Sequence, residues 1–155
     1  MTFQISALER EQFSHLFGQD DDVLSKNGVQ RVVADSDCGF PCRVSLKDAA
    51  AGESVLLLNY EHQPADTPYR SSHAIFVREQ ASEAMPAVNE IPEVLSKRLL
   101  SVRAFDRSGM MIDADVVDGQ HLAALIERLF DNESADYLHI HNARPGCYAA
   151  LVSRA

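Results

Sequence analysis

The chain has 155 residues, of which 46% are hydrophobic and 24% are charged, and its formal net charge at pH 7 is -9. This length is close to the commonest domain size and the apolar fraction is sufficient for a core, so we expect a single soluble domain over residues 1–155. The excess of acidic residues repels a polyphosphate backbone, and no basic patch counters it. We therefore expect no nucleic-acid partner.

The N-terminal stretch MTFQISALEREQFSHL lacks the basic start and apolar run of a secretory signal. No part of the chain approaches the ~20 consecutive apolar residues that span a bilayer. We therefore expect a cytoplasmic protein with no membrane partner. The three cysteines, Cys38, Cys42 and Cys147, cannot all pair with one another, and a reducing compartment favours thiols, so we expect no structural disulfide.

Two short helices are predicted near the N-terminus. Ser6 followed three residues later by Glu9 has the pattern of a capping box, which predicts a helix from Ser6. Its apolar face would contain Phe13, Leu16 and Phe17. The acidic run at residues 20–22 suits the N-terminus of a second helix, which is predicted to end at Gly28.

Four stretches in the first half of the chain have the composition of β-strands. Residues 29–35 and 38–46 predict the first two, and residues 71–79 predict the last. Residues 54–62 begin with an almost continuous apolar run, which is typical of a strand covered on both faces. We therefore place residues 54–62 at the centre of the sheet.

The second half of the chain begins with an exposed loop over residues 80–90, followed by a brief helix that starts at Pro92. Residues 99–105 and 110–117 flank the turn sequence DRSG and predict a hairpin. Residues 136–154 predict a second hairpin with Pro145 and Gly146 in its turn.

The clearest helix spans residues 118–131. Asp118 can cap its N-terminus, and one apolar stripe is formed by Leu122, Leu125, Ile126, Leu129 and Phe130. We expect this helix, the longest, to cover one face of the sheet. Strands joined mainly by hairpins, with few helices, indicate an α+β fold with an antiparallel or mixed sheet.

Two polar stretches predict a site for a small anionic metabolite. HIHNARPGCY (139–148) lies in the C-terminal hairpin, and YRSSH (69–73) lies where a strand begins. In this hypothesis the acid or base is supplied by His73, His139 and His141. The ligand-binding residues are Arg43, Tyr69, Arg70, Ser72, Asn142 and Arg144. The hypothesis requires the C-terminal hairpin to lie beside residues 60–73, and it leaves open whether the protein is an enzyme.

A metal site is an alternative. Side chains alternate along a strand, so His139 and His141 face the same side, and Glu61, His62 or His73 could complete a ligand set. The nearby Arg144 disfavours a bound cation, and the carboxylate expected soon after the His-x-His of a cupin is missing. The hydroxyl residues that follow each histidine of a two-histidine phosphoesterase are missing too. We therefore assign no metal ligand and no cofactor from the sequence.

Two other pairs of residues do not predict a functional site. Cys38 and Cys42 do not have the spacing of a redox pair, and Asp113 with Asp115 is better explained as the solvated face of a hairpin. The rival to a ligand-binding protein is a non-catalytic interaction protein, whose arginines and tyrosines contact a protein partner. The oligomeric state cannot be derived from these residues.

Five stretches of the chain are similar to those of an uncharacterised bacterial family: GFPCRVSL, LLLNYEHQP, YRSSHAIFVRE, MMIDADVVDG and LHIHNARPGCYAA. The family is the domain-of-unknown-function family numbered twelve hundred and three, and the resemblance covers essentially the whole chain. It implies a bacterial, stand-alone protein. It implies no activity, cofactor or catalytic residue.

Overall fold

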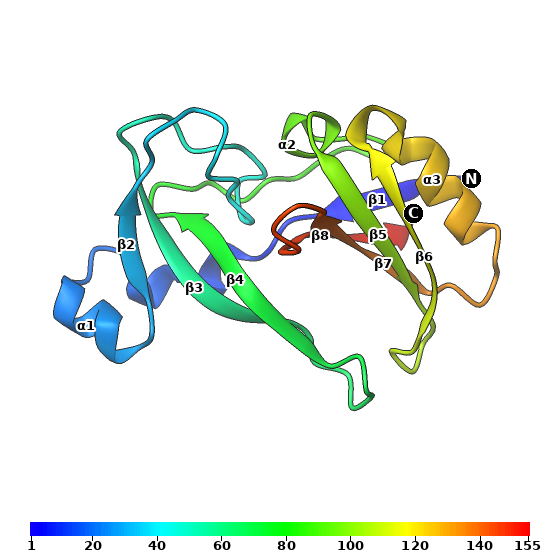
Figure 1. Cartoon of the computed structure of the whole chain (residues 1–155), viewed down its shortest axis with the longest axis horizontal. Coiled ribbons are helices and arrows are strands. Elements are labelled where there is room, and N and C mark those ends of the chain that lie inside the picture. Colours follow the sequence, from blue (N-terminus) through cyan, green and yellow to red (C-terminus); the bar gives the residue numbers. More distant parts are fainter. The chain divides into compact units, whose positions relative to one another are not determined.

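The computed structural model describes all 155 residues, with eight β-strands and three short α-helices (Figure 1). The strands form two antiparallel sheets, which confirms the predicted α+β class. The chain divides into two compact units: Met1–Ser6, Glu61–His73 and Met85–Ala155 form the first, and Ala7–Tyr60 and Ala74–Ala84 form the second. A single domain over residues 1–155 stays a prediction.

The five-stranded sheet belongs to the first unit and contains both predicted hairpins. Its strand order is β1 (Phe3–Ser6), β8 (Tyr148–Arg154), β7 (Tyr137–Asn142), β5 (Leu99–Phe105) and β6 (Met111–Asp118). β7 therefore lies in the middle, hydrogen-bonded to β8 on one side and to β5 on the other. All its residues after Tyr137 are buried.

Helix α3 (Leu122–Phe130) covers one face of this sheet, as predicted, and packs against β5 and β6 (Figure 1). The five residues of its apolar stripe are all buried. On its outer side Arg128 forms salt bridges with Asp113 and Asp115 of β6, at 3.3 and 2.9 Å. These two aspartates pair across the ladder with Ala104 and Val102 of β5, whose side chains lie on the same face. Helix α3 therefore covers the face of the sheet that contains Val102 and Ala104.

The turn before α3 requires a glycine. Asp118 caps a 3₁₀ turn, η3 (Gly119–His121), by accepting a hydrogen bond from the N–H of Gln120. A Cβ added to Gly119 would lie 2.0 Å from the carbonyl oxygen of Leu95 in helix α2 (Glu93–Ser96). No side chain fits at that distance, so Gly119 allows the two segments to pack closely.

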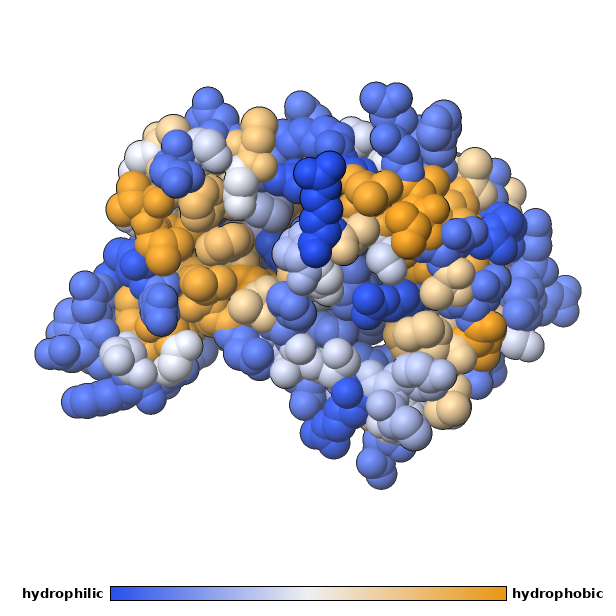
Figure 2. All heavy atoms as spheres, viewed as in Figure 1, coloured by the Kyte–Doolittle hydropathy of each residue, from blue (hydrophilic) through white to orange (hydrophobic).

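The three-stranded sheet has the order β2 (Gln30–Val33), β3 (Ser54–Gln63) and β4 (Ser71–Arg78), so β3 is central in the smaller of two sheets, whereas the sequence predicted one sheet with this strand at its centre. The last residues of β3, Glu61–Gln63, and the first of β4 belong to the first unit. In the second unit, Asp20 caps helix α1 (Asp21–Lys26), and the chain leaves it through Gly28 at a φ of 70°. Figure 2 shows apolar residues at the surface over this sheet.

Two predicted elements are wrong. In place of a helix from Ser6 the chain forms β1 and two 3₁₀ turns, η1 (Arg10–Gln12) and η2 (Ser14–Leu16). Ser6 is paired with Leu151 of β8, so strand pairing overrides the local capping pattern. Residues 38–46 form no strand beyond isolated β-bridges at Pro41 and Cys42, because the chain turns after Cys42, where Leu46 adopts a φ of 49° and donates a backbone hydrogen bond to Cys42.

The three cysteines and the helices can be compared with what the sequence predicts about disulfides and membrane spans. No disulfide joins the three cysteines. The Sγ of Cys42 is buried and accepts hydrogen bonds from the backbone N–H groups of Ser45 and Arg78, so this thiol is part of the local turn structure. None of the helices is both long and apolar enough to cross a membrane.

Candidate functional site

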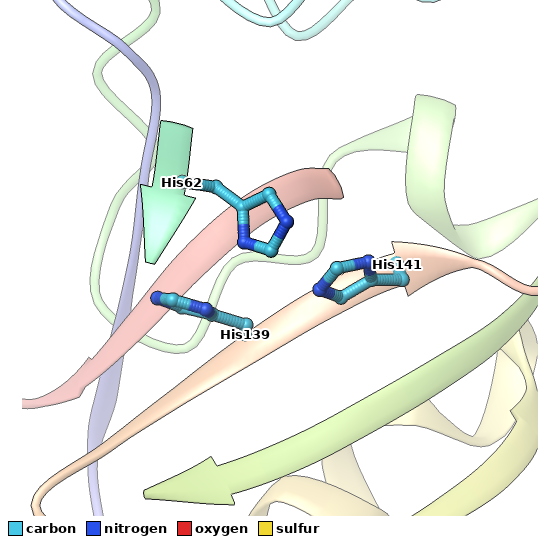
Figure 3. Close-up of side chains that lie close together, drawn as sticks. All are labelled: His62, His139 and His141. Carbon is cyan, nitrogen blue, oxygen red and sulfur yellow. The ribbon is translucent and has the colours of Figure 1, made fainter. Parts of the chain in front are cut away.

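Three histidines form a cluster in the first unit, here called the histidine cluster: His62, His139 and His141 (Figure 3). Each offers a ring nitrogen, and these nitrogens all lie within 4.8 Å of one another. The residues are 8%, 3% and 1% exposed. The cluster therefore joins the C-terminal hairpin to the end of β3.

The strand geometry explains why the rings converge. Because side chains alternate along β7, His139 and His141 lie on one face of the sheet, while Leu138 and Ile140 lie on the other. That other face is the one that α3 covers, since Ile140 pairs with Val102 of β5. The two imidazoles consequently lie on the face opposite α3.

His62 comes from the end of β3 and points toward this face (Figure 3). Its neighbour Gln63 donates a hydrogen bond of 2.7 Å to the hydroxyl of Tyr137, at the start of β7. The ring of His62 stacks on Tyr148 of β8, with centroids 5.3 Å apart and an interplanar angle of 7°. These contacts hold the third imidazole against the other two.

The surroundings of the cluster are mostly aromatic. His139 contacts the rings of Phe105 and Tyr137, with centroids 5.0 and 5.2 Å away. His62 meets His141 edge to face at 4.9 Å. No carboxylate forms a hydrogen bond with any of the three imidazoles, and the carbonyl of Gly146, beside His141, is the one hydrogen-bond partner that favours a protonated ring.

Burial accordingly makes protonation of the cluster unfavourable. It lowers the pKa of His62 from 6.5 to about 4, and the positive charges of Arg103 and His73 add to this effect. It lowers the pKa values of His139 and His141 to about 3. All three rings are therefore neutral near pH 7, which is the form of imidazole that binds a metal.

The hydrogen bonds of the cluster leave ring nitrogens available. The Nδ1 of His141 lies 2.9 Å from the carbonyl oxygen of Gly146 and donates its proton there, which leaves Nε2 with a lone pair. The Nδ1 atoms of His62 and His139 are buried and have no hydrogen-bond partner. Buried polar atoms of this kind are costly unless something satisfies them.

Arg103 of β5 is the cation at this site. It pairs across the ladder with His139, so it lies on the same face, and its Nη1 is 3.5 Å from the Nε2 of His141. It forms no salt bridge, and burial lowers the pKa of its guanidinium below the ordinary value. The side chain of Arg103 is only partly buried.

Several predicted site residues lie in the first unit near this cluster. The structure brings His139 and His141 together, and His73, half-buried at the start of β4, is close enough for its charge to lower the pKa values of His62 and His141. Asn142 is buried at the end of β7. Its Nδ2 contacts the Sγ of Cys147 at 3.5 Å and its Oδ1 has no partner.

The predicted anion-binding residues differ in exposure and in contacts, and their role in binding an anion stays a prediction. Arg70 is exposed and forms a salt bridge of 3.2 Å with Glu61, so its charge is already balanced. Arg144 is exposed in the turn of the C-terminal hairpin, and Tyr69 and Ser72 are exposed as well. Arg43 belongs to the second unit, where it is buried and donates a hydrogen bond to the carbonyl of Pro41.

From the sequence, His62 was only a possible completing ligand of a metal site, and Arg103 was not predicted as a site residue. A signal for Arg103 was present, because it is the single charged residue in the apolar strand LLSVRAF. For His62 the signal was weaker. Its place at the end of a strand does not specify which distant strand it meets.

The fold and the histidine cluster define an α+β protein with a buried, neutral three-histidine site on an antiparallel sheet. The chain belongs to the family described as "Protein of unknown function (DUF1203)", whose model matches residues 39–154, and this confirms the resemblance found in the sequence. The matched range includes the whole histidine cluster and Arg103. No curated protein and no solved structure matches the chain.

Proposed function

We propose that this protein binds a divalent transition metal ion through His62, His139 and His141. One observation carries the proposal: three buried, neutral imidazoles present ring nitrogens within 4.8 Å of one another. Three histidines are a known ligand set for zinc, and imidazole also suits iron, copper and nickel. At ordinary zinc–nitrogen distances the tetrahedral separation of ligands is about 3.4 Å, so small rotations of the rings suffice to close the site.

The hydrogen bond from His141 to Gly146 supports this proposal. Histidines that bind metals usually donate their second ring N–H to a carbonyl or carboxylate, which fixes the tautomer and aims the free nitrogen. The Nδ1 of His141 meets the Gly146 carbonyl in this way. A metal would also give a partner to buried ring nitrogens that now have none.

Three protein ligands leave a coordination position for water or another small molecule, as in catalytic rather than structural zinc sites. The proposal therefore covers a metal site that is open to a ligand and leaves the reaction unassigned. Cysteines without a disulfide are consistent with a reducing compartment, and a cytoplasmic location in a bacterial cell is part of the proposal. Cell fractionation tests that part.

The central test is a titration of metal-free protein with Zn²⁺, Co²⁺ and Ni²⁺, followed by calorimetry and by elemental analysis of the dialysed complex. We expect one tightly bound ion per chain. His139→Ala and His62→Ala each remove a ligand and should weaken the affinity for metal more than about 100-fold. This exceeds the loss typical of changing a group that is only hydrogen-bonded to a ligand.

His121→Ala is the matched control, because His121 lies in the same unit but is exposed in η3. It should bind metal as the unaltered protein does. Equal affinity in His139→Ala and His121→Ala would rule out the histidine cluster as the metal site. Failure of the unaltered protein to bind any of the three ions would rule out the function.

A further inference from the structure

The histidine cluster contains no anionic candidate ligand. Its three candidate ligands are neutral, so a bound divalent ion would keep its full charge. Glu61 is adjacent to His62 in the chain, but it is exposed and paired with Arg70. The charged groups whose fields reach the cluster are Arg103 and His73, and neither is anionic.

Arg103 has more hydrogen-bonding capacity than the structure uses. A guanidinium has five N–H donors in a planar fork, and here one contact is formed, at 3.5 Å to the Nε2 of His141. A partly buried arginine without a carboxylate partner has lost hydration and has gained no ion pair. A small anion at this position would supply that ion pair.

The lone pair of this same His141 nitrogen would coordinate the metal in place of accepting from Arg103, so the ion would displace that contact and lie close to the guanidinium. Two cations at this separation repel each other strongly where solvent is partly excluded. An oxyanion bound to both would remove the repulsion, because one oxygen can coordinate the metal while the other accepts from the guanidinium.

We propose that Arg103 is the ligand-recognition residue of the site, and that a small oxyanion, a carboxylate or a phosphate, occupies the open coordination position and bridges the metal to Arg103. This inference rests on the proposed metal site and names the class of molecule that the site takes. Metal and anion then bind with positive coupling, and each raises the affinity for the other by the same factor.

The test is a Co²⁺ titration of the full chain, followed by visible absorption, in buffer with chloride only, with acetate, or with inorganic phosphate. The unaltered protein should bind Co²⁺ about tenfold more tightly with one of the two anions, within the usual range for coupled sites, and its absorption spectrum should change. The anion with the larger effect tells a carboxylate ligand from a phosphate ligand.

Arg103→Met removes the charge and keeps an apolar stem, and Arg103→Gln is a second neutral variant in case the first does not fold. Both should lose the anion effect, while Arg103→Lys should keep part of it. Arg107→Met is the matched control, because Arg107 lies in the same hairpin but is exposed and paired with Asp136. It should behave as the unaltered protein does.

Binding of Co²⁺ without any response to either anion would overturn the role of Arg103 and leave the metal site standing. A full anion effect in both Arg103→Met and Arg103→Gln would also overturn the role of Arg103 and leave the metal site standing. If the unaltered protein does not bind Co²⁺, the metal site and the anion proposal are both overturned. Capture of free Co²⁺ by the anions affects all variants equally and therefore cancels in the comparison.

Discussion

The Nδ1 of His141 lies 2.9 Å from the carbonyl oxygen of Gly146, within the hairpin that joins β7 to β8. The two groups are only five residues apart, so a local turn determines the tautomer of a buried imidazole. Gly146 has a φ of 81°, a conformation that favours glycine. The geometry of this turn is thereby linked to the chemistry of the site.

Gly146→Ala should weaken metal binding by about tenfold, in the range typical of an outer-shell change, because an alanine strains the left-handed backbone and shifts the carbonyl away from His141. Nothing lies within 4 Å of an added Cβ, so the effect comes from strain and not from overlap. Calorimetric titration with Zn²⁺ measures it. Gly52→Ala is the control, since Gly52 has a similar φ of 88° and equal space but lies in the second unit.

Both glycine variants should lose about 1–2 kcal/mol of unfolding free energy, measured in urea, because the backbone cost is the same. Only the change at residue 146 should alter metal affinity. An equal loss of affinity at residue 52 would mean that general destabilisation, and not the carbonyl of Gly146, is responsible.

Tyr148→Leu should lower both stability and metal affinity, whereas Tyr148→Phe should retain most of the affinity. The phenol ring stacks on His62 and limits the orientations that this imidazole can adopt. Loss of such an aromatic pair costs about 0.5–1.5 kcal/mol beyond the buried area. The measurement is again the dissociation constant for Zn²⁺. If phenylalanine is no better than leucine, the stacked ring does not position His62.

Acid should destabilise the metal-free protein between pH 6.5 and about 3. The folded-state pKa values of His139 and His141 are near 3, so in this range the unfolded chain binds more protons than the folded one. The free energy of unfolding is therefore unaffected by these groups above pH 6.5 and falls as the pH decreases. From pH 7 to about pH 5 each of the two contributes a loss of roughly 2 kcal/mol.

Urea unfolding at several pH values, with a chelator present, checks this dependence. His139→Phe keeps a ring of similar size and removes one titrating group, so its pH dependence should be shallower by the contribution of one histidine. The control His121→Ala changes an exposed histidine outside the histidine cluster. A slope unchanged in His139→Phe would show that the ring is already protonated in the folded state.

Metal should raise the melting temperature of the protein. An ion present at about 100 times its dissociation constant adds about 2.7 kcal/mol, which for a chain of this size corresponds to roughly 5–10 °C. The variant with all three cluster histidines replaced by alanine should show no shift. A thermal scan with Zn²⁺, Co²⁺ and Mg²⁺ tests this, and Mg²⁺ should have little effect because it prefers oxygen ligands. An equal shift with Mg²⁺ would point to the exposed carboxylates.

The sequence by itself determined the local elements and part of the site. The alternation along a strand placed His139 and His141 on one face, the apolar run of residues 54–62 predicted the central strand of its sheet, and the 3.6-residue period of α3 predicted which side of that helix is buried. These features depend on short-range geometry, in which each residue interacts with neighbours a few positions away. Local patterns failed at Ser6, where pairing with a strand from the other end of the chain decided the structure.

Only the tertiary structure decided which polar residues meet. His62 reaches the histidine cluster from a different sheet, and Arg103 faces His139 because β5 pairs with β7 in one particular register. Strand order and register depend on the packing of the whole sheet, and a shift of one residue would turn Arg103 to the opposite face. The burial that keeps the three imidazoles neutral comes from the same packing. For that reason the sequence suggested an anion site at Arg43, Arg70 and Arg144, whereas the folded chain groups three neutral histidines beside Arg103, which has no salt bridge.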